Sequence, residues 1–404
     1  MNIYSYARNA MLAFTFFVLL SGGAQATTWY FAPTGSDSNT GSANSPWLNP
    51  GNHNASYNPG DTLQIGAGTY TPTWGWQLTA KGSASGGYIT LQCWRNFSSH
   101  ISVTTANMAG IFLIHGAAYW DIRGCDISGS GANASGISVG GSFSAPFGAI
   151  HHIVVENNSI HGAACAGVGV GGNGNISGGT AYPVDYVTIR NNNVYQNSTT
   201  APAHCSGIDI YEPIAYDTLS GYHLIIQGNV VDWNNDCDTC STPPTDGNGI
   251  ILDDFKYTQN TIPGFSSYTP ATLVAGNTVY NNGGKAIHAF QSQNVTISGN
   301  YTWGNNEDAK VCENSQGGGD EIDAVFSKTI SVTGNEAQAS VGTCGGYETY
   351  AFVDLPQGTS SSDVFTNNVG FATVGTKVNV GYSAAPPSAY LSSLAGYSFG
   401  STNR

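Results

Sequence analysis

The chain has 404 residues, of which 53 are glycine, 9% are charged and 40% are hydrophobic. This hydrophobic content can form a core and argues against intrinsic disorder, which goes with low hydrophobicity. The net charge of −14 excludes the basic footprint that nucleic-acid binding needs, so we expect no nucleic acid as a partner. The same charge disfavours unaided binding of an acidic glycan, unless a bound cation reverses the field locally.

Residues 1–26 have the pattern of an export signal. Arg8 precedes the apolar run Met11–Leu20, and Ala24-Gln25-Ala26 fits the cleavage pattern of small residues. The apolar run is shorter than the roughly 18 residues of a membrane span, and no later segment approaches that length. We therefore expect a secreted chain, periplasmic or extracellular, with no membrane span; a retained signal anchor is the alternative.

A short segment of alternating apolar residues that ends on Asn recurs through the rest of the chain. One copy is Ile153–Asn158 and the next is Val187–Asn192. The final Asn occupies the same place in seven copies: Asn158, Asn192, Asn229, Asn277, Asn300, Asn335 and Asn368. A stacked ladder of side-chain amides that satisfy backbone groups explains an Asn at a fixed corner of every repeat.

A second strand lies in most repeats and starts with Gly or Ala, as in Gly207–Ile210 and Gly249–Leu252. Such short strands cannot bury their inner faces alone, but repeats stacked on one another bury a continuous core. Helical periodicity is absent, and a propeller would need four strands per repeat. The sequence predicts an all-β fold, a right-handed parallel β-helix (a solenoid) of about 8–10 coils. We expect one domain over residues 27–404, with an N-terminal cap near residues 30–50 and a short tail after Gly381.

Two segments resemble the pectate-lyase-like superfamily of right-handed β-helices. They are Thr27–Gly41 (TTWYFAPTGSDSNTG) and Pro59–Tyr70 (PGDTLQIGAGTY). The resemblance extends over essentially the whole mature chain and implies the fold. The superfamily contains lyases, hydrolases, epimerases and adhesins, so the activity has to be argued from the site.

The outward face of the second strand is where we expect the chemistry. Aligned on their Gly-Ile or Ala-Ile starts, the repeats present a first outward column of Ser138, Gly169, Asp209, Ile251, His288 and Asp323. A second column, two residues further on, contains Gly140, Gly171, Tyr211, Asp253, Phe290 and Val325. Glu212 and Asp254 follow at the corner. The change from Gly and Ser to acidic, aromatic and His side chains along one stack predicts a site.

A Ca²⁺-dependent lyase that cleaves an acidic, uronate-containing glycan by β-elimination is the leading interpretation. In such β-helix lyases, as the resemblance implies, Ca²⁺ neutralises the uronate carboxylate and a Lys or Arg takes the proton. Ca²⁺ prefers oxygen ligands, and the predicted set is Asp209, Glu212, Asp253 and Asp254. Lys256 or Lys285 would be the base, with a pKa lowered by burial or by a neighbouring cation.

An inverting glycoside hydrolase is the second interpretation. Asp209 and Asp253 are one coil and two residues apart, which corresponds to about 8 Å. Inverting hydrolases hold their carboxyl groups about 6.5–9.5 Å apart. The order Asp209, Asp253-Asp254, His288 resembles the polygalacturonase-type hydrolases, although the Gly-His-Gly and Arg-x-Lys signatures of that type are absent.

A non-catalytic glycan-binding or cell-surface protein is the third interpretation. On the enzymatic interpretations, the residues expected to contact a polysaccharide are Tyr211, Tyr257, Phe290 and Asp323, and His288 joins the catalytic set. Ordinary structural roles are also open: Asp253-Asp254 could form a solvated turn, and His288 could be a hydrogen-bonded surface residue. We expect the protein to be a monomer.

Eight cysteines in an exported chain indicate disulfides. Equivalent positions on neighbouring coils are about 4.8 Å apart, which suits the Cα separation of a disulfide. Three cysteine intervals match one coil and predict the bridges Cys93–Cys125, Cys165–Cys205 and Cys312–Cys344. The remaining Cys237 and Cys240 are predicted to form a local bridge, with a redox or zinc CxxC motif as the alternative.

Overall fold

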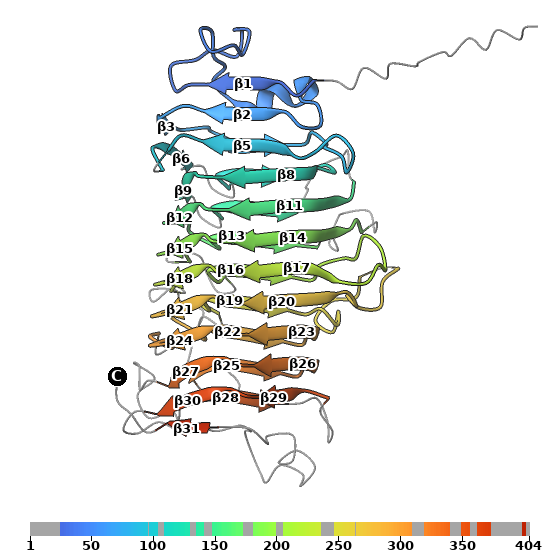
Figure 1. Ribbon diagram of the computed structural model, residues 1–404, viewed down its shortest axis with the longest axis vertical. Coiled ribbons are helices and arrows are strands. Elements are labelled where there is room, and N and C mark those ends of the chain that lie inside the picture. Colours follow the sequence, from blue (N-terminus) through green and yellow to red (C-terminus); the bar gives the residue numbers. More distant parts are fainter. Residues whose placement is uncertain are drawn as a thin grey trace, which may run out of the picture.

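The computed structural model describes residues 25–95, 97–103, 109–129, 135–140, 148–172, 181–198, 205–235, 246–262, 264–308, 319–339, 349–355, 362–372 and 398–400. Its strands form three parallel sheets that wind together into a right-handed β-helix, as predicted. The coils stack along the long axis from β1 at one end to β31 at the other (Figure 1). Most of the predicted signal, residues 1–24, and the predicted tail after Gly381, apart from residues 398–400, lie outside the described residues. Within the described residues, no helix is long and apolar enough to cross a membrane.

From β2 to β30 the described strands follow one another through the three sheets in the same order. The first sheet contains β1 (Thr28–Phe31), β2 (Thr62–Ile65), β5 (Ile89–Cys93), β8 (Ala118–Arg123), β11 (Ile150–Glu156), β14 (Val184–Arg190), β17 (Tyr222–Gln227), β20 (Ala271–Ala275), β23 (Gln293–Ser298), β26 (Lys328–Thr333) and β29 (Val364–Thr366). The second contains β3 (Gly68–Tyr70), β6 (Ser99–Val103), β9 (Asp126–Gly129), β12 (Ser159–His161), β15 (Asn193–Tyr195), β18 (Val230–Asp232), β21 (Thr278–Tyr280), β24 (Tyr301–Trp303), β27 (Glu336–Ala339), β30 (Val369–Ala372) and β31 (Ser398–Gly400).

The third sheet is shorter and carries the candidate site. It contains β4 (Trp76–Leu78), β7 (Ile111–Leu113), β10 (Ile137–Gly140), β13 (Val168–Gly171), β16 (Ile208–Tyr211), β19 (Ile250–Asp253), β22 (Ile287–Phe290), β25 (Gly319–Val325) and β28 (Thr349–Leu355). Among the described residues, the three sheets hold eleven, eleven and nine strands in this order, and a short 3-10 helix, η1 (Pro50–Ser56), lies near the N-terminal end.

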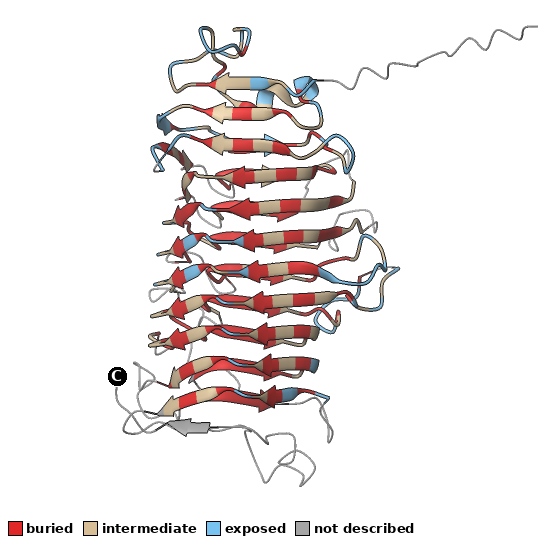
Figure 2. Ribbon diagram, in the orientation of Figure 1, coloured by how far each residue is buried: buried red, intermediate tan, exposed pale blue. Residues whose placement is uncertain are grey.

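Buried and half-buried residues alternate along the strands, and the buried ones form the core. In β5 the residues Ile89, Leu91 and Cys93 are buried, and the two residues between them are only half-buried. Strand residues point alternately to the two faces of a sheet, so one face of every strand turns inward. The same banding runs down the whole stack (Figure 2). Because stacked coils share one core, no strand has to bury its apolar face alone.

The seven corner asparagines form the predicted ladder between the first and second sheets. In each step the Nδ2 of one Asn donates to the Oδ1 of the next, at 2.9–3.0 Å. The same Oδ1 accepts from the backbone N–H of the preceding Asn, and Nδ2 also donates to a strand carbonyl, as Asn192 does to Val155. All seven are buried. Each amide therefore satisfies backbone groups at the corner that would otherwise be unpaired.

A second ladder, which the sequence analysis missed, lies between the second and third sheets. It runs through Asn197, Asn234, Asn282 and Asn305 and ends on Glu321, whose carboxylate accepts from Asn305. Burial raises the pKa of Glu321 to about 8, despite hydrogen bonds from Asn305 that lower it. A Cβ at Gly207 would lie 2.7 Å from Asn234 Nδ2, which explains why this third-sheet strand is preceded by glycine.

Two of the predicted disulfides are confirmed. Cys93 is bonded to Cys125 and Cys165 to Cys205, with Cα separations of 5.0 and 5.2 Å. Both join neighbouring coils, as their spacing predicted. The other four cysteines, Cys237, Cys240, Cys312 and Cys344, lie outside the described residues.

We expect the double variant Cys165→Ser/Cys205→Ser to unfold at lower guanidinium concentration than the wild type. The bridge closes a loop with a sequence separation of 40 residues. In the chain-entropy account, its loss lowers the free energy of unfolding by roughly 2–4 kcal/mol. Equilibrium unfolding followed by circular dichroism measures this. An unchanged midpoint would mean that the bridge does not stabilise the coil junction.

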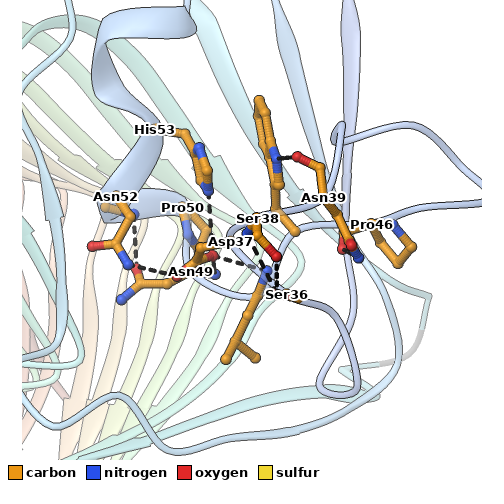
Figure 3. A network of polar contacts seen from close by, with 12 residues as sticks. Ser36, Asp37, Ser38, Asn39, Pro46, Asn49, Pro50, Asn52 and His53 are labelled. Atoms are coloured by element: carbon orange, nitrogen blue, oxygen red, sulfur yellow. Dashed lines mark hydrogen bonds and ion pairs between the residues drawn. The ribbon is translucent and has the colours of Figure 1, made fainter.

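The loop between β1 and η1 is held by Asp37 (Figure 3). Its carboxylate accepts from the backbone N–H of Asn49 at 2.8 Å, from Asn52 Nδ2 at 2.6 Å and from His53 at 3.2 Å. The His53 ring stacks on Trp47, with centroids 3.8 Å apart. This network fixes the loop at the N-terminal end of the described stack.

Candidate active site

The register of the third sheet confirms both predicted outward columns. Through hydrogen-bonded neighbours, the first column runs Ser138, Gly169, Asp209, Ile251, His288 and Asp323. The second runs Gly140, Gly171, Tyr211, Asp253, Phe290 and Val325. Aligning the repeats on their Gly-Ile starts was therefore correct from β10 to β25.

A cleft of about 540 Å³ lies on this face. Along β10 and β13 its lining is small: Ser138, Gly140, Gly169 and Gly171. Towards β16 and β19 it becomes acidic and hydrogen-bonding: Asp209, Tyr211, Asp246, Asp253 and Gln259. The cleft thus combines a floor without bulky side chains, which a flat ring could approach closely, with a group of three carboxylates at one end.

Burial and neighbouring carboxylates raise the pKa values of Asp209 and Asp253 in this cleft. Burial, followed by the negative charges of Asp246 and Asp253, raises the pKa of Asp209 well above its usual range. Burial, followed by Asp246 and Asp254, raises the pKa of Asp253 to about 8. Gln259 Nε2 donates to Asp253 Oδ1 at 2.5 Å, and this hydrogen bond lowers the pKa of Asp253 because it favours the charged form. Among the residues that the structure describes, no such hydrogen bond acts on the pKa of Asp209. Of the two carboxyls, Asp253 is therefore the one whose charged form is stabilised by a hydrogen-bond donor.

The corner after β19 separates Asp254 from the cleft. Asp254 has a φ of 51°, and its carboxylate is buried. It accepts hydrogen bonds from the backbone N–H groups of Thr258 and Gln259 at 2.6 and 2.7 Å, and from the Thr258 hydroxyl at 2.8 Å. Asp254 holds the turn that carries Gln259. Asp254 does not line the cleft, and its predicted catalytic and metal-binding roles stay predictions.

Glu212, at the equivalent corner after β16, is also turned away. Its φ is 45°, it is 3% exposed, and Oε1 accepts from Asn260 Nδ2 at 2.8 Å. The same amide donates to the Tyr211 hydroxyl, 2.5 Å away. Within the described residues, the carboxylates of Asp209, Glu212, Asp253 and Asp254 do not bring three oxygens within 4.8 Å of one another. The predicted four-ligand Ca²⁺ set is thus divided between the cleft and the turn.

Both lysines predicted as bases lie away from the cleft. Lys256 Nζ donates to the backbone oxygen of Phe326 at 2.7 Å. Lys285 is 3% exposed, and its Nζ lies 3.9 Å from Asp323 Oδ2. Neither lines the cleft. A general base must reach its proton within hydrogen-bond distance, and the structure places neither lysine in the lining of this cleft, so the base role of Lys256 or Lys285 stays a prediction.

His288 and Asp323 form a buried pair on the coils beyond the cleft. His288 Nδ1 lies 2.5 Å from Asp323 Oδ1, and the two residues are 8% and 0% exposed. Together with Lys285 they make an ionic cluster. The predicted catalytic role of His288 and the predicted substrate contact of Asp323 both require access that this burial restricts. Phe290 is half-buried and packs against His288, with ring centroids 5.4 Å apart.

Of the two predicted tyrosine contacts, only Tyr211 lines the cleft. Tyr257 is buried, and its hydroxyl donates to the backbone oxygen of Pro213 at 2.6 Å. The ring of Tyr257 does not line the cleft, and its predicted contact with a sugar stays a prediction.

Asp246 and Gln259 are site residues that the sequence analysis missed. Both lie outside the strands, Asp246 shortly before β19 and Gln259 in the turn after it. The repeat aligns strands and corners only. The one signal available was that Asp246 precedes a Gly-Asn-Gly-Ile strand start, in the coil that carries Asp253.

Comparisons with known proteins identify the fold. No protein-family model matches the chain, and no curated protein matches it. Among solved structures, the complex of XylC with xylose has a TM-score of 0.52 at 12% identity and covers 87% of this chain and 69% of that one. Pectate lyase Pel9A has a TM-score of 0.47 at 16% identity, covering 90% and 80%, and a GH136 lacto-N-biosidase from Eubacterium ramulus has 0.44 at 13%, covering 93% and 67%. The chain has the parallel β-helix fold, in agreement with the resemblance found in its sequence.

Proposed function

We propose that this protein is an exported glycoside hydrolase that cleaves a polysaccharide in the cleft of the third sheet. The observation that carries this proposal is the group formed by Asp209, Asp246 and Asp253, whose mutual repulsion and burial raise the pKa values of two members. Groups whose pKa values are shifted strongly inside a cleft are candidates for acid–base chemistry. Export as a monomer, after removal of residues 1–26, and folding of 27–404 as one domain are parts of the proposal.

The roles of the two carboxyls follow from the hydrogen bond that Gln259 donates to Asp253 and that favours its charged form. Asp209 donates its proton to the glycosidic oxygen, while the carboxylate of Asp253 takes a proton from the attacking water. The backbone positions of Asp209 and Asp253 are offset by one coil and two residues, which corresponds to about 8 Å. A separation of this size leaves room for a water between the base and the sugar. The reaction therefore inverts the anomeric centre.

The cleft also favours a class of substrate. Three carboxylates repel a polyanionic chain, so a neutral or weakly charged polysaccharide suits the cleft best. The floor of Gly169 and Gly171 lets a sugar ring approach the backbone, and the Tyr211 ring lies at the acidic end.

A Ca²⁺-dependent lyase is the second candidate, and one observation favours it. The negative charges that raise the pKa values of Asp209 and Asp253 would be offset by a bound cation, and Ca²⁺ takes oxygen ligands. Among the described residues, the oxygens of Asp209, Asp246 and Asp253 do not all lie within 4.8 Å of one another, so the side chains would have to move to hold it. Such a cation would also let an acidic glycan approach. Neither Lys256 nor Lys285, the predicted bases of this reaction, lines the cleft.

A screen of neutral and acidic polysaccharides separates the candidates. The hydrolase yields new reducing ends on a neutral glycan, without ultraviolet absorbance from an unsaturated uronate, and keeps its activity in EDTA. Release of an unsaturated product, abolished by EDTA and restored by Ca²⁺, would replace the proposal with the lyase. Binding without cleavage of any glycan would indicate the non-catalytic interpretation.

We expect Asp246→Asn to shift the acidic limb of the kcat/KM profile to lower pH. Asp246 raises the pKa of Asp253, which is about 8, so removing its charge weakens the hold of Asp253 on its proton. The base then forms at lower pH, with a shift on the order of one unit. Initial rates across the pH range measure this. If the acidic limb of the kcat/KM profile stayed at the same pH or moved to higher pH, the assignment of Asp253 as the base would be contradicted.

A further inference from the structure

Three metal-ligating side chains meet on the outer face of the second sheet, away from the cleft. His100 comes from β6, Asp126 from β9 and His161 from β12, which are successive neighbours in that sheet. His100 and Asp126 are paired in the register, and His161 lies two residues beyond the partner of Asp126. Three consecutive coils thus contribute one side chain each.

The carboxylate stands between the two imidazole rings. His100 Nδ1 lies 2.7 Å from Asp126 Oδ2, and His161 Nε2 lies 2.9 Å from Asp126 Oδ1. Within the part of the chain that the structure describes, this is the one group of three such residues whose ligand atoms all lie within 4.8 Å of one another. In a tetrahedral site with bonds of about 2.0–2.1 Å, ligand atoms are about 3.3 Å apart. Small side-chain rotations would reach that spacing.

The three side chains are accessible to solvent, and neighbouring residues hold them in place. The side chains of His100, Asp126 and His161 are 31%, 22% and 26% exposed, so an ion can reach them from solvent. The His161 ring stacks on Tyr195, with centroids 4.9 Å apart and planes 16° apart. The backbones of all three residues are held by strand pairing. The ligands therefore need no rearrangement of the chain to bind an ion.

We propose that His100, Asp126 and His161 form a binding site for a divalent transition-metal ion of the Zn²⁺ type. Two imidazoles and one carboxylate suit Zn²⁺, whereas Ca²⁺ and Mg²⁺ take oxygen ligands. Water fills the fourth position. Each ring binds through the nitrogen that now faces Asp126, and its proton is carried on the other ring nitrogen. No redox change is involved.

Such an ion would cross-link three coils. Asp126 directly follows Cys125, which is bonded to Cys93 on the preceding coil. The disulfide joins two coils at this corner, and the metal would extend the cross-link through β12. An ion that binds only the folded chain raises its stability by mass action.

Titration of the untagged, metal-free chain with Zn²⁺, and with Co²⁺ as a spectroscopic probe, tests the proposal. The wild type should bind one ion with micromolar affinity, show visible Co²⁺ bands, and gain on the order of 2–5 °C in Tm at saturating Zn²⁺. His161→Gln and Asp126→Asn should each weaken Zn²⁺ binding at least tenfold and lose the Tm gain, because each removes one of only three protein ligands.

Two matched variants serve as controls. His53→Gln removes another histidine paired with an aspartate, and should bind Zn²⁺ as the wild type does. Asp209→Asn alters the cleft, and should also retain binding, which separates this site from the proposed active site. Equal Zn²⁺ affinity in the wild type and His161→Gln, or no binding by the wild type at micromolar Zn²⁺, would overturn the proposal and leave a hydrogen-bonded clamp.

Discussion

Asp253→Asn is expected to lower kcat on the true substrate by about 10²–10⁴-fold, the usual contribution of a positioned acid or base. The amide keeps the shape of the side chain and can still contact Gln259, but it cannot take a proton from water. Asp209→Asn should have an effect of the same order, because an amide cannot protonate the leaving oxygen. Steady-state kinetics measures both.

The melting temperature distinguishes a loss of catalysis from damage to the fold. Each substitution removes one of three mutually repelling carboxylates, so Tm should stay within a few degrees of the wild type or rise. Asp121→Asn is the matched control: Asp121 is an outward carboxylate of the first sheet whose burial raises its pKa to about 6. It should leave kcat unchanged. Full turnover in both cleft variants would place the chemistry elsewhere.

Asn192→Ala is expected to be the most destabilising single substitution among those considered. Asn192 Nδ2 donates to Val155 O and to Asn229 Oδ1, while its Oδ1 accepts from the backbone and side chain of Asn158. Alanine leaves these buried groups unpaired, and each costs about 1–3 kcal/mol. The free energy of unfolding should fall by roughly 3–6 kcal/mol.

The neighbouring residue provides the control for this ladder. Asn193 is exposed, at the start of β15, and Asn193→Ala should change the free energy of unfolding by less than about 0.5 kcal/mol. Denaturant unfolding of the two variants compares the same chemical change at adjacent positions. Similar losses in both would show that the ladder does not stabilise the stack.

The repeat allowed the strands, the register and the first ladder to be predicted. A side-chain period of two and a fixed corner Asn determine which residues face inward, so Asp209 and Asp253 were placed correctly on the outward face. The Cys93–Cys125 and Cys165–Cys205 bridges followed from the same spacing.

The site residues that the repeat could not place lie at the corners and in the loops. The residue after four third-sheet strands has a positive φ, and this turns its side chain away from the outward column: Glu212, Asp254, Gln291 and Phe326. Adjacent aspartates at 253 and 254 look equivalent in the sequence but serve the cleft and the turn respectively. Asp246 and Gln259 reach the cleft from loops whose paths the repeat does not determine.

The second ladder was missed for a related reason. Its asparagines follow very short second-sheet strands, as Asn197 follows β15 and Asn234 follows β18. Three-residue strands give little periodicity to align. The buried Glu321 at its end looks like a loop charge beside Asp320 until the stacking of coils places it under Asn305.

A crystal structure of Asp253→Asn with an oligosaccharide of the cleaved polysaccharide tests the central claim most directly. We expect a sugar ring over Gly169 and Gly171, against Tyr211, with a glycosidic oxygen in hydrogen-bond reach of Asp209 and a water beside residue 253. Sugar bound on another sheet, with the cleft empty, would contradict the assignment of this cleft as the active site.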